Sequence, residues 1–210
     1  MTLSLVHCHP ATGTVATITA TGGVAVGGYV HHCWRGVGAC VTQGRFTNPW
    51  YPAQVHGALV DGATAKQALG AAISQDSDAA LRQCLVMDAH GRSSVHSGSE
   101  NIAKVEDVRF PGVAAVGNML QSSDVVQILA EHFLSLSATN SGAAIKRSEA
   151  PAIRIITTST CWRISLTPLM PRWTRVAISV APAQPHCVSS RSSKPPLICA
   201  LTGRKTSWLP

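Results

Sequence analysis

Histidine and cysteine side chains gather at two places near the start of the chain. His7 and His9 alternate along one stretch, so they share a face if it is a strand, and His31, His32 and Cys33 follow one another directly. Imidazole nitrogen and thiolate sulfur are ligands that zinc takes in proteins. However, no second pair with zinc-finger spacing follows, and the two groups would have to meet in space. The sequence favours scattered surface or core histidines, and we expect no metal and no cofactor.

The seven cysteines form no recognisable pattern, since their number is odd and no CxxC pair occurs. This usage is typical of reduced, partly buried thiols. The opening residues, MTLSLVHCHP, lack the basic region and the long apolar segment of a secretory signal. No apolar run approaches the roughly 18 residues that span a bilayer. We therefore expect a cytoplasmic protein with no membrane partner.

Charge divides the chain near residue 145. Residues 1–145 carry seven Lys and Arg and nine Asp and Glu, whereas residues 146–210 carry ten Lys and Arg and one acid, Glu149. Glycine falls from sixteen residues to one across the same point, and proline rises from four to eight. A change this abrupt predicts a boundary between a domain at 1–145 and a basic tail at 146–210.

The basic tail allows two functional interpretations. It could bind nucleic acid by neutralising phosphates, or its cationic, Trp-bearing stretch could lie on a membrane surface. Four prolines, at positions 168, 171, 182 and 185, break any long amphipathic helix. We therefore expect no nucleic-acid partner. The alternative of a basic-tail nucleic-acid binder predicts salt-dependent DNA binding that disappears when residues 146–210 are deleted.

The elements that position these side chains follow from hydrophobic periodicity. Segments 3–8 and 14–21 flank a turn with Pro10 and Gly13 and predict a hairpin. Segments 23–30 and 36–44 predict two further strands, with the His31 group in a loop between them. Residues 51–62 and 64–75 show helical spacing, and Thr64 is a candidate cap.

The remaining part of the domain alternates strands with one more helix. Residues 82–98 predict two strands around a turn at His90-Gly91, and residues 110–120 predict a buried strand. Residues 122–137 predict the clearest helix, capped by Ser122 or Ser123. This order of elements predicts an α+β domain in layers, with largely antiparallel sheets.

Several segments together resemble a known family. They are MTLSLVHCHPATGTVA, GVAVGGYVHHCWRGVGACVTQGRFTNPWY, QCLVMDAHGRSSVHSG and FPGVAAVGNML, in this order between residue 1 and about residue 136. They are similar to the bacterial and archaeal family catalogued as domain of unknown function 1028. That resemblance implies the four-layer α-β-β-α sandwich of the N-terminal-nucleophile (Ntn) hydrolases.

The resemblance also implies a type of chemistry. In Ntn hydrolases the first residue of the mature chain attacks a carbonyl, and its own α-amino group takes the proton. Met1 followed by Thr2 suits such a site, and Ser4 lies on the same strand face. Gly117-Asn118 and Thr42-Gln43 could supply donors to an oxyanion. The catalytic candidates are therefore Thr2, Ser4, Gln43 and Asn118.

Three further polar residues of the family-like segments are candidates for substrate binding, namely Thr42, Asn48 and His96. The substrate would be a small-molecule or peptide amide. A non-catalytic binding domain on the same fold remains an alternative, and so does a homo-oligomer. One departure bears on the site, because the family's usual Arg-Asp pair before the Pro-Ala-Thr-Gly turn is Cys8-His9 here.

The family resemblance stops where the basic tail begins. Members usually continue with an amphipathic helix, a Gly-rich segment and a strand containing Asp-Leu-Arg, and none is visible in residues 146–210. Permissible codons for residues 159–174, read one base earlier, can encode a Leu- and Ala-rich acidic helix. The same shift over residues 194–210 can encode the Asp-Leu-Arg strand. We therefore hypothesise a one-base frame change between about residues 138 and 159, which predicts a sandwich incomplete at its C-terminal end, an open sheet edge and a poorly ordered tail.

Overall fold

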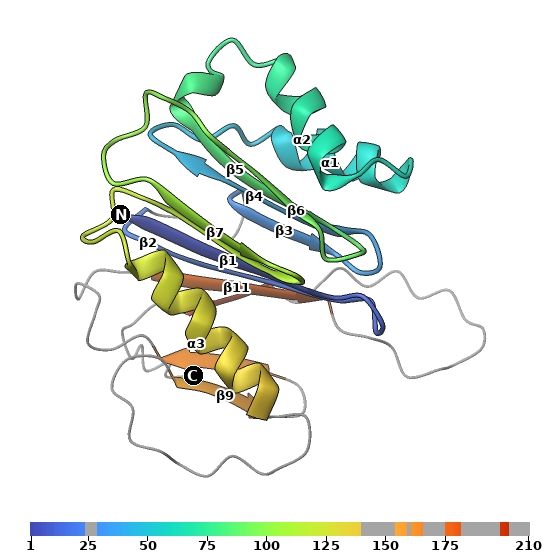
Figure 1. The fold of residues 1–210 in the computed structure, drawn as a ribbon, viewed down its shortest axis with the longest axis vertical. Coiled ribbons are helices and arrows are strands. Elements are labelled where there is room, and N and C mark those ends of the chain that lie inside the picture. The colour runs from blue at the N-terminus through green and yellow to red at the C-terminus, as the bar shows by residue number, and fades with distance from the viewer. Residues whose placement is uncertain (24–28, 140–153, 159–160, 166–174, 182–197, 202–210) are drawn as a thin grey trace, which may run out of the picture.

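The computed structural model describes residues 1–23, 29–139, 154–158, 161–165, 175–181 and 198–201 (Figure 1). Within these residues the fold is a mixture of α and β structure with two main antiparallel sheets and three α-helices. The larger sheet has the strand order β12-β11-β2-β1-β8-β7. Its strands are β1 (Thr2–His9), β2 (Thr14–Thr21), β7 (Glu106–Phe110), β8 (Val113–Asn118), β11 (Arg175–Ala181) and β12 (Ile198–Leu201). The predicted α+β class with antiparallel sheets is confirmed.

The smaller sheet has four strands in the order β3-β4-β5-β6. They are β3 (His31–Trp34), β4 (Gly38–Gly44), β5 (Arg82–Asp88) and β6 (Ser93–Ser97). The α-helices are α1 (Tyr51–Val60), α2 (Ala65–Ser74) and α3 (Val125–Thr139), and a short 3-10 turn, η2 (Ala79–Leu81), precedes β5. A separate two-stranded sheet pairs β9 (Arg154–Thr158) with β10 (Cys161–Ser165).

The two main sheets face each other, and the helices lie on their outer faces (Figure 1). Alternation along β1 shows why. Val6 and Cys8 point inward to an apolar cluster that includes Leu85 of the facing sheet, whereas Leu3 and Leu5 point outward to α3. The outer face of the smaller sheet packs on α1 and α2. The end of the inter-sheet space near Thr2 is polar, and the other end is apolar.

Local sequence accounts for the positions of the helices. Thr64 caps α2 as predicted, with a complete capping box to Gln67. The helix predicted after Ser122 or Ser123 begins at Val125, so the residue before it is Asp124. At Gly117 a Cβ would lie 2.6 Å from a Leu120 methyl, so a larger residue there would require the Leu120 side chain to move.

Two predictions about strands need correction. The predicted loop at His31-His32-Cys33 is strand β3, because His31 and Cys33 are buried on alternate positions and the strand pairs with β4. Strand β7 was not predicted, since its sequence EDVRF carries three charges and has only a polar-apolar alternation to reveal it. Most of the predicted strand at 23–30 lies outside the described residues.

The edge of the larger sheet differs from the expected open edge. Strand β11 pairs with β2 along its length, and β12 pairs with β11, so β2 is not an edge strand. The expectation of an uncovered edge is wrong at this strand. The missed signal is the alternation of Val176, Ile178 and Val180 with smaller residues, which is typical of a strand even within a basic tail.

Candidate functional site

Three of the four predicted catalytic side chains meet in one hydrogen-bond network between the sheets. Ser4 Oγ donates to Gln43 Oε1 at 2.7 Å, and Gln43 Nε2 donates to Gln83 Oε1 at 2.7 Å. Asn118 Nδ2 donates to the same Gln83 oxygen at 3.1 Å. All four side chains are buried. The sequence interpretation missed Gln83, although it is polar within an otherwise apolar strand pattern and lies opposite Gln43 in the β4–β5 register.

Backbone carbonyl groups fix the direction of this network. Gln83 Nε2 lies 3.1 Å from the Gly117 carbonyl oxygen and 3.4 Å from that of Glu106, and carbonyl oxygens only accept hydrogen bonds. Gln83 must therefore present Oε1 to the other two amides, which must present their NH₂ groups. Gln43 then turns its own oxygen to Ser4, so the Ser4 hydroxyl donates its proton to an amide oxygen.

This direction defines what Ser4 can do. Its only proton is held by Gln43, so Ser4 Oγ accepts the hydrogen bond that joins it to Thr19 Oγ1 at 2.8 Å. An amide oxygen is not a base at neutral pH, and Ser4 is therefore not activated for nucleophilic attack in this arrangement. Ser4 instead links the two sheets, and its predicted catalytic role stays a prediction.

Thr2 lies at the polar end of the same inter-sheet space. It begins β1, its Oγ1 is 3.0 Å from Thr21 Oγ1, and it is opposite Asn118 in the β1–β8 register. Its side chain is on the same strand face as Ser4, as predicted. Among the described residues, the hydrogen-bond partners of both hydroxyls are neutral. No side chain that hydrogen-bonds to the Thr2 hydroxyl in the described chain can act as a base at neutral pH.

Some buried polar atoms in the inter-sheet space have no hydrogen-bond partner within the described part of the chain. They include Asn118 Oδ1, Thr17 Oγ1 and both ring nitrogens of His31. Each of these three side chains is at least nine-tenths buried. Unpaired buried polar groups are costly in a folded protein, so they are candidates for contact with a ligand.

The three predicted binding residues lie elsewhere, near the start of α1 and the start of β5. Thr42 Oγ1 is 2.9 Å from Thr47 Oγ1, and His96 Nε2 is 2.8 Å from the Ala79 carbonyl oxygen. Asn48 Nδ2 donates to Asp76 Oδ2 at 2.9 Å. The structure does not bring these side chains into the network around Gln83, and each one holds a loop in place.

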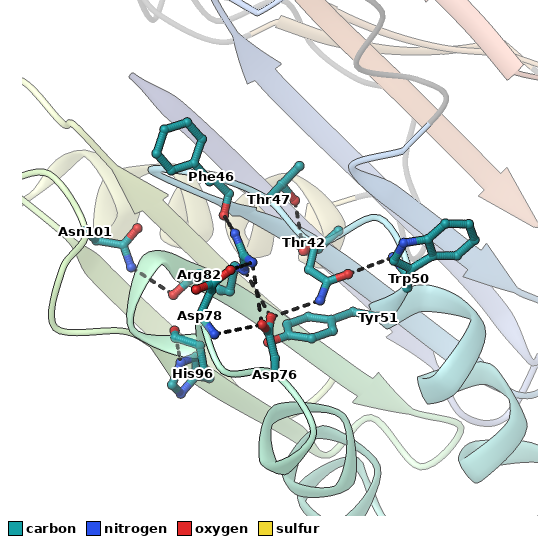
Figure 2. Close-up of polar contacts among 12 residues, drawn as sticks. Thr42, Phe46, Thr47, Trp50, Tyr51, Asp76, Asp78, Arg82, His96 and Asn101 are labelled. Atoms are coloured by element: carbon teal, nitrogen blue, oxygen red, sulfur yellow. Dashed lines mark hydrogen bonds and ion pairs between the residues drawn. The ribbon is translucent and has the colours of Figure 1, made fainter.

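A charged cluster surrounds Asp76, and the sequence interpretation missed it (Figure 2). Arg82 Nε lies 3.0 Å from Asp76 Oδ2, and Tyr51 OH donates to the same oxygen at 2.8 Å. Arg82 also donates to the Phe46 carbonyl oxygen at 3.0 Å and reaches Asp78 at 3.3 Å. The spacing of two acids before an arginine, at 76, 78 and 82, was the available signal.

The Asp76 carboxylate is held in its charged form. Burial alone would raise the pKa of this group, but hydrogen bonds from Arg82, Asn48 and Tyr51 outweigh it and hold the pKa well below its usual range. Burial, followed by the hydrogen bond to Asp76, raises the pKa of Tyr51. The cluster joins α1, the end of α2 and β5, and its polar groups satisfy one another.

Comparison with known proteins identifies the family. Residues 2–147 match the family described as "Family of unknown function (DUF1028)". The chain belongs to this family. A crystal structure of a DUF1028 protein from Silicibacter pomeroyi is similar in fold, with a TM-score of 0.67 and 23% sequence identity over 95% of this chain and 80% of that chain. None of the curated proteins matches the chain.

The DUF1028 match ends close to the predicted boundary at residue 145. The tail beyond it includes strands β9 to β12, and its remaining residues lie outside the described ranges, as do all of its side chains. The frame-change hypothesis and the alternative of a nucleic-acid-binding tail therefore stay predictions.

The two histidine groups of this DUF1028 chain do not converge within the described ranges, although the rings of His7 and His9 lie edge to face with centroids 6.4 Å apart. His31 faces the other sheet, whereas the adjacent His32 faces the opposite way. The His32 ring stacks on the Trp34 ring, and their centroids are 6.2 Å apart. His7 packs on Phe133 of α3. Among the residues that the structure describes, no group of three or more His, Cys, Asp or Glu side chains could hold a metal ion.

The prediction of reduced thiols is confirmed for the described side chains, where Cys8, Cys33, Cys40 and Cys84 are buried and form no disulfide. The Sγ atoms of Cys40 and Cys84 lie 3.8 Å apart beneath α1 and α2. Within the same ranges, no helix has the length and apolar character to cross a bilayer.

Proposed function

We propose that this DUF1028 domain is an amide-bond hydrolase whose nucleophile is Thr2, exposed by removal of Met1. The substrate is a small-molecule or peptide amide. One observation carries the proposal. Thr2 begins β1 with its side chain in the polar end of the inter-sheet space, opposite a buried Asn118 whose oxygen has no partner in the described chain.

The neutral surroundings of Thr2 support this role. Its partner Thr21 and its register neighbour Asn118 cannot act as bases at neutral pH. An α-amino group on Thr2 itself, with an ordinary pKa of about 8, is therefore the nearest group able to take the hydroxyl proton. The order of layers, with helices outside two facing sheets, is compatible with the Ntn sandwich and adds support from the fold.

The chemistry balances without a cofactor. Thr2 Oγ1 bonds to the amide carbonyl carbon as its proton passes to the α-amino group. The ammonium then gives this proton to the leaving nitrogen as the C–N bond breaks, which leaves an ester on Thr2. Water, deprotonated by the same amine, hydrolyses the ester and restores the hydroxyl.

The test combines intact mass with covalent labelling. We expect the purified full chain to lack Met1 and to gain one adduct from a fluorophosphonate or β-lactone probe. The Thr2→Ala variant should lose the adduct, whereas Ser4→Ala should keep it, because the Ser4 proton is held by Gln43. Retention of Met1 in the native chain, or labelling of the Thr2→Ala variant, contradicts the proposal.

A non-catalytic binding domain is the second candidate, and one observation favours it. Met1 packs against the apolar cluster beneath α3, together with Leu3 and Leu5. A retained Met1 would keep the Thr2 nitrogen in a peptide bond, and that nitrogen could then not serve as a base. The mass measurement separates the two candidates directly.

A further inference from the structure

The unpaired oxygen of Asn118 has a defined direction in space. The backbone carbonyl groups of Gly117 and Glu106 fix the Gln83 amide, and Gln83 in turn fixes the NH₂ group of Asn118. The two ends of the Asn118 amide therefore cannot exchange without placing two oxygens in contact. The unpaired group of Asn118 is therefore a hydrogen-bond acceptor, Oδ1. A buried acceptor of this kind is expected to have a donor.

The backbone directly after Asn118 is strained. This is a second observation, independent of the unpaired oxygen, that points to this end of β8 as a candidate functional site. Met119 has a φ of +51° and Lys104 a φ of +32°, and no other described non-glycine residue has a positive φ. The two segments are joined, because the Leu120 backbone N–H donates to the Lys104 carbonyl oxygen at 3.2 Å. Left-handed backbone at bulky residues is unfavourable and is concentrated at functional sites.

Strand register shows which donor lies within reach. Thr2 and Asn118 are directly opposite each other, and both side chains face the inter-sheet space. The Cβ atoms of such a pair lie about 5 Å apart, so the end of an Asn side chain can reach the backbone nitrogen of its neighbour. In a chain that starts at Thr2, this nitrogen is the α-amino group.

We propose that Asn118 is a positioning residue whose Oδ1 accepts a hydrogen bond from the α-amino group of Thr2. The inference deepens the proposed function and rests on it, because it gives the amine that acts as base a fixed orientation. With one N–H held by Asn118, the lone pair of the amine is free to turn to Thr2 Oγ1.

Few charged groups surround the α-amine. Its pKa should therefore respond to the hydrogen bond with Asn118. The side chains that face Thr2 from β2, β4, β5 and β8 are Thr21, Gln43, Gln83 and Asn118, and none of them titrates near neutral pH. Two charged residues lie at the start of β7 and just before it: Glu106, which is opposite Gly117, and Lys104, which donates to the Gln121 carbonyl oxygen.

The experiment measures the pKa of the α-amine rather than activity. The full chain is released from a cleavable N-terminal fusion so that it starts at Thr2 whether or not Met1 is removed naturally. Selective ¹³C labelling of threonine, followed by NMR of the Thr2 Cα signal at a series of pH values, reports the pKa of the amine and leaves its N–H groups intact. We expect Asn118→Asp, which adds a negative charge beside the amine and places its second oxygen against Gln83 Oε1, to raise this pKa by about one unit. Asn118→Leu removes the acceptor and should lower it.

A matched control separates positioning from folding. Asn101 holds three backbone groups near the start of β5 and does not contact the network around Thr2. The Asn101→Leu variant should lower the melting temperature without moving the α-amine pKa. If neither Asn118 variant moves the pKa, the inference is overturned while the labelling result for Thr2 still stands. If the pKa moves as expected but no adduct forms, the proposed hydrolase fails and only the hydrogen bond between Asn118 and the α-amino group is retained.

Discussion

Arg82 and Gln83 are neighbours on β5, yet they serve two opposite regions of the molecule. Arg82 enters a charged cluster with Asp76 and Asp78 on the helix side of the smaller sheet (Figure 2). Gln83 points between the sheets, where it joins only neutral groups. Both side chains are buried. The alternation of a strand is enough to place the two residues in different chemical surroundings.

The two regions differ in how completely their polar atoms are paired. The Asp76 carboxylate receives hydrogen bonds from Arg82, Asn48 and Tyr51, which is the arrangement of a structural cluster. The neutral region leaves the Asn118 oxygen without a partner in the described chain. The unpaired oxygen lies on the strand position opposite Thr2, which makes this end of the inter-sheet space the place to test for a ligand.

The largest expected effect separates the two neighbours. Arg82→Leu leaves the buried Asp76 charge without its cation and should lower the free energy of unfolding by about 4 kcal/mol. Gln83→Leu leaves only neutral groups unpaired and should cost about 2 kcal/mol. Urea denaturation of both variants measures the difference. If both variants lose the same free energy of unfolding, breaking the charged cluster costs no more than breaking the neutral network, and the contrast between the two regions is wrong.

Acid should destabilise the protein in two separate pH ranges. Burial and then the nearby charge of His32 lower the pKa of His31 to about 4, whereas an unfolded histidine titrates near 6.5. The unfolded chain therefore binds a proton first, so the His31 contribution is complete above about pH 6.5 and is lost as the pH falls towards 4. The total loss is about 3 kcal/mol.

Asp76 acts in a lower range. Its pKa is depressed in the folded state, so its contribution is present above the ordinary carboxyl pKa of about 4 and is lost at lower pH. Denaturation at pH 7.5, 4 and 2 should show both steps, because the two ranges meet near pH 4. His31→Phe should flatten most of the first step, and Asp76→Asn should remove the second. An unchanged slope between pH 6.5 and 4 in His31→Phe contradicts the assignment.

The smallest effect tests the unpaired atoms themselves. Thr17 and Thr19 are both buried on the same face of β2, but only the Thr19 hydroxyl has a partner, Ser4 Oγ. Thr19→Val should lower the free energy of unfolding by about 1 kcal/mol, whereas Thr17→Val should leave it unchanged or raise it. Thermal melts of the two variants suffice. A loss in Thr17→Val equal to that in Thr19→Val would show that the Thr17 hydroxyl is paired.

Much of the framework could be predicted from local pattern. The three helices, the cap at Thr64 and the strands of the first hairpin follow from short-range periodicity and capping chemistry. The prediction failed where the pattern was short or charged. Strand β3 has four residues and two adjacent histidines, and β7 carries three charges on five residues. Pairing with a neighbouring strand, which no local pattern records, decides both.

The candidate site was predicted in part. Ser4, Gln43 and Asn118 do meet, but Gln83, which joins them, has no motif in the sequence. The predicted binding residues Thr42, Asn48 and His96 instead hold loops on the helix side of the smaller sheet. Residues that are close in sequence, such as Thr42 and Gln43, were assigned to one site. They lie on opposite faces of the sheet, because alternate residues of a strand point to opposite sides.

By itself the sequence determined the family, the antiparallel α+β class and the place where the chain changes character near residue 145. These features depend on residue type and on spacing along the chain. Only the tertiary structure decided that Thr2 lies opposite Asn118, that Ser4 donates its proton to Gln43, and that the Asn118 oxygen has no partner among the described residues. The physical reason is that hydrogen-bond direction is fixed by backbone carbonyl groups on other strands, which are brought together only when the two sheets pack.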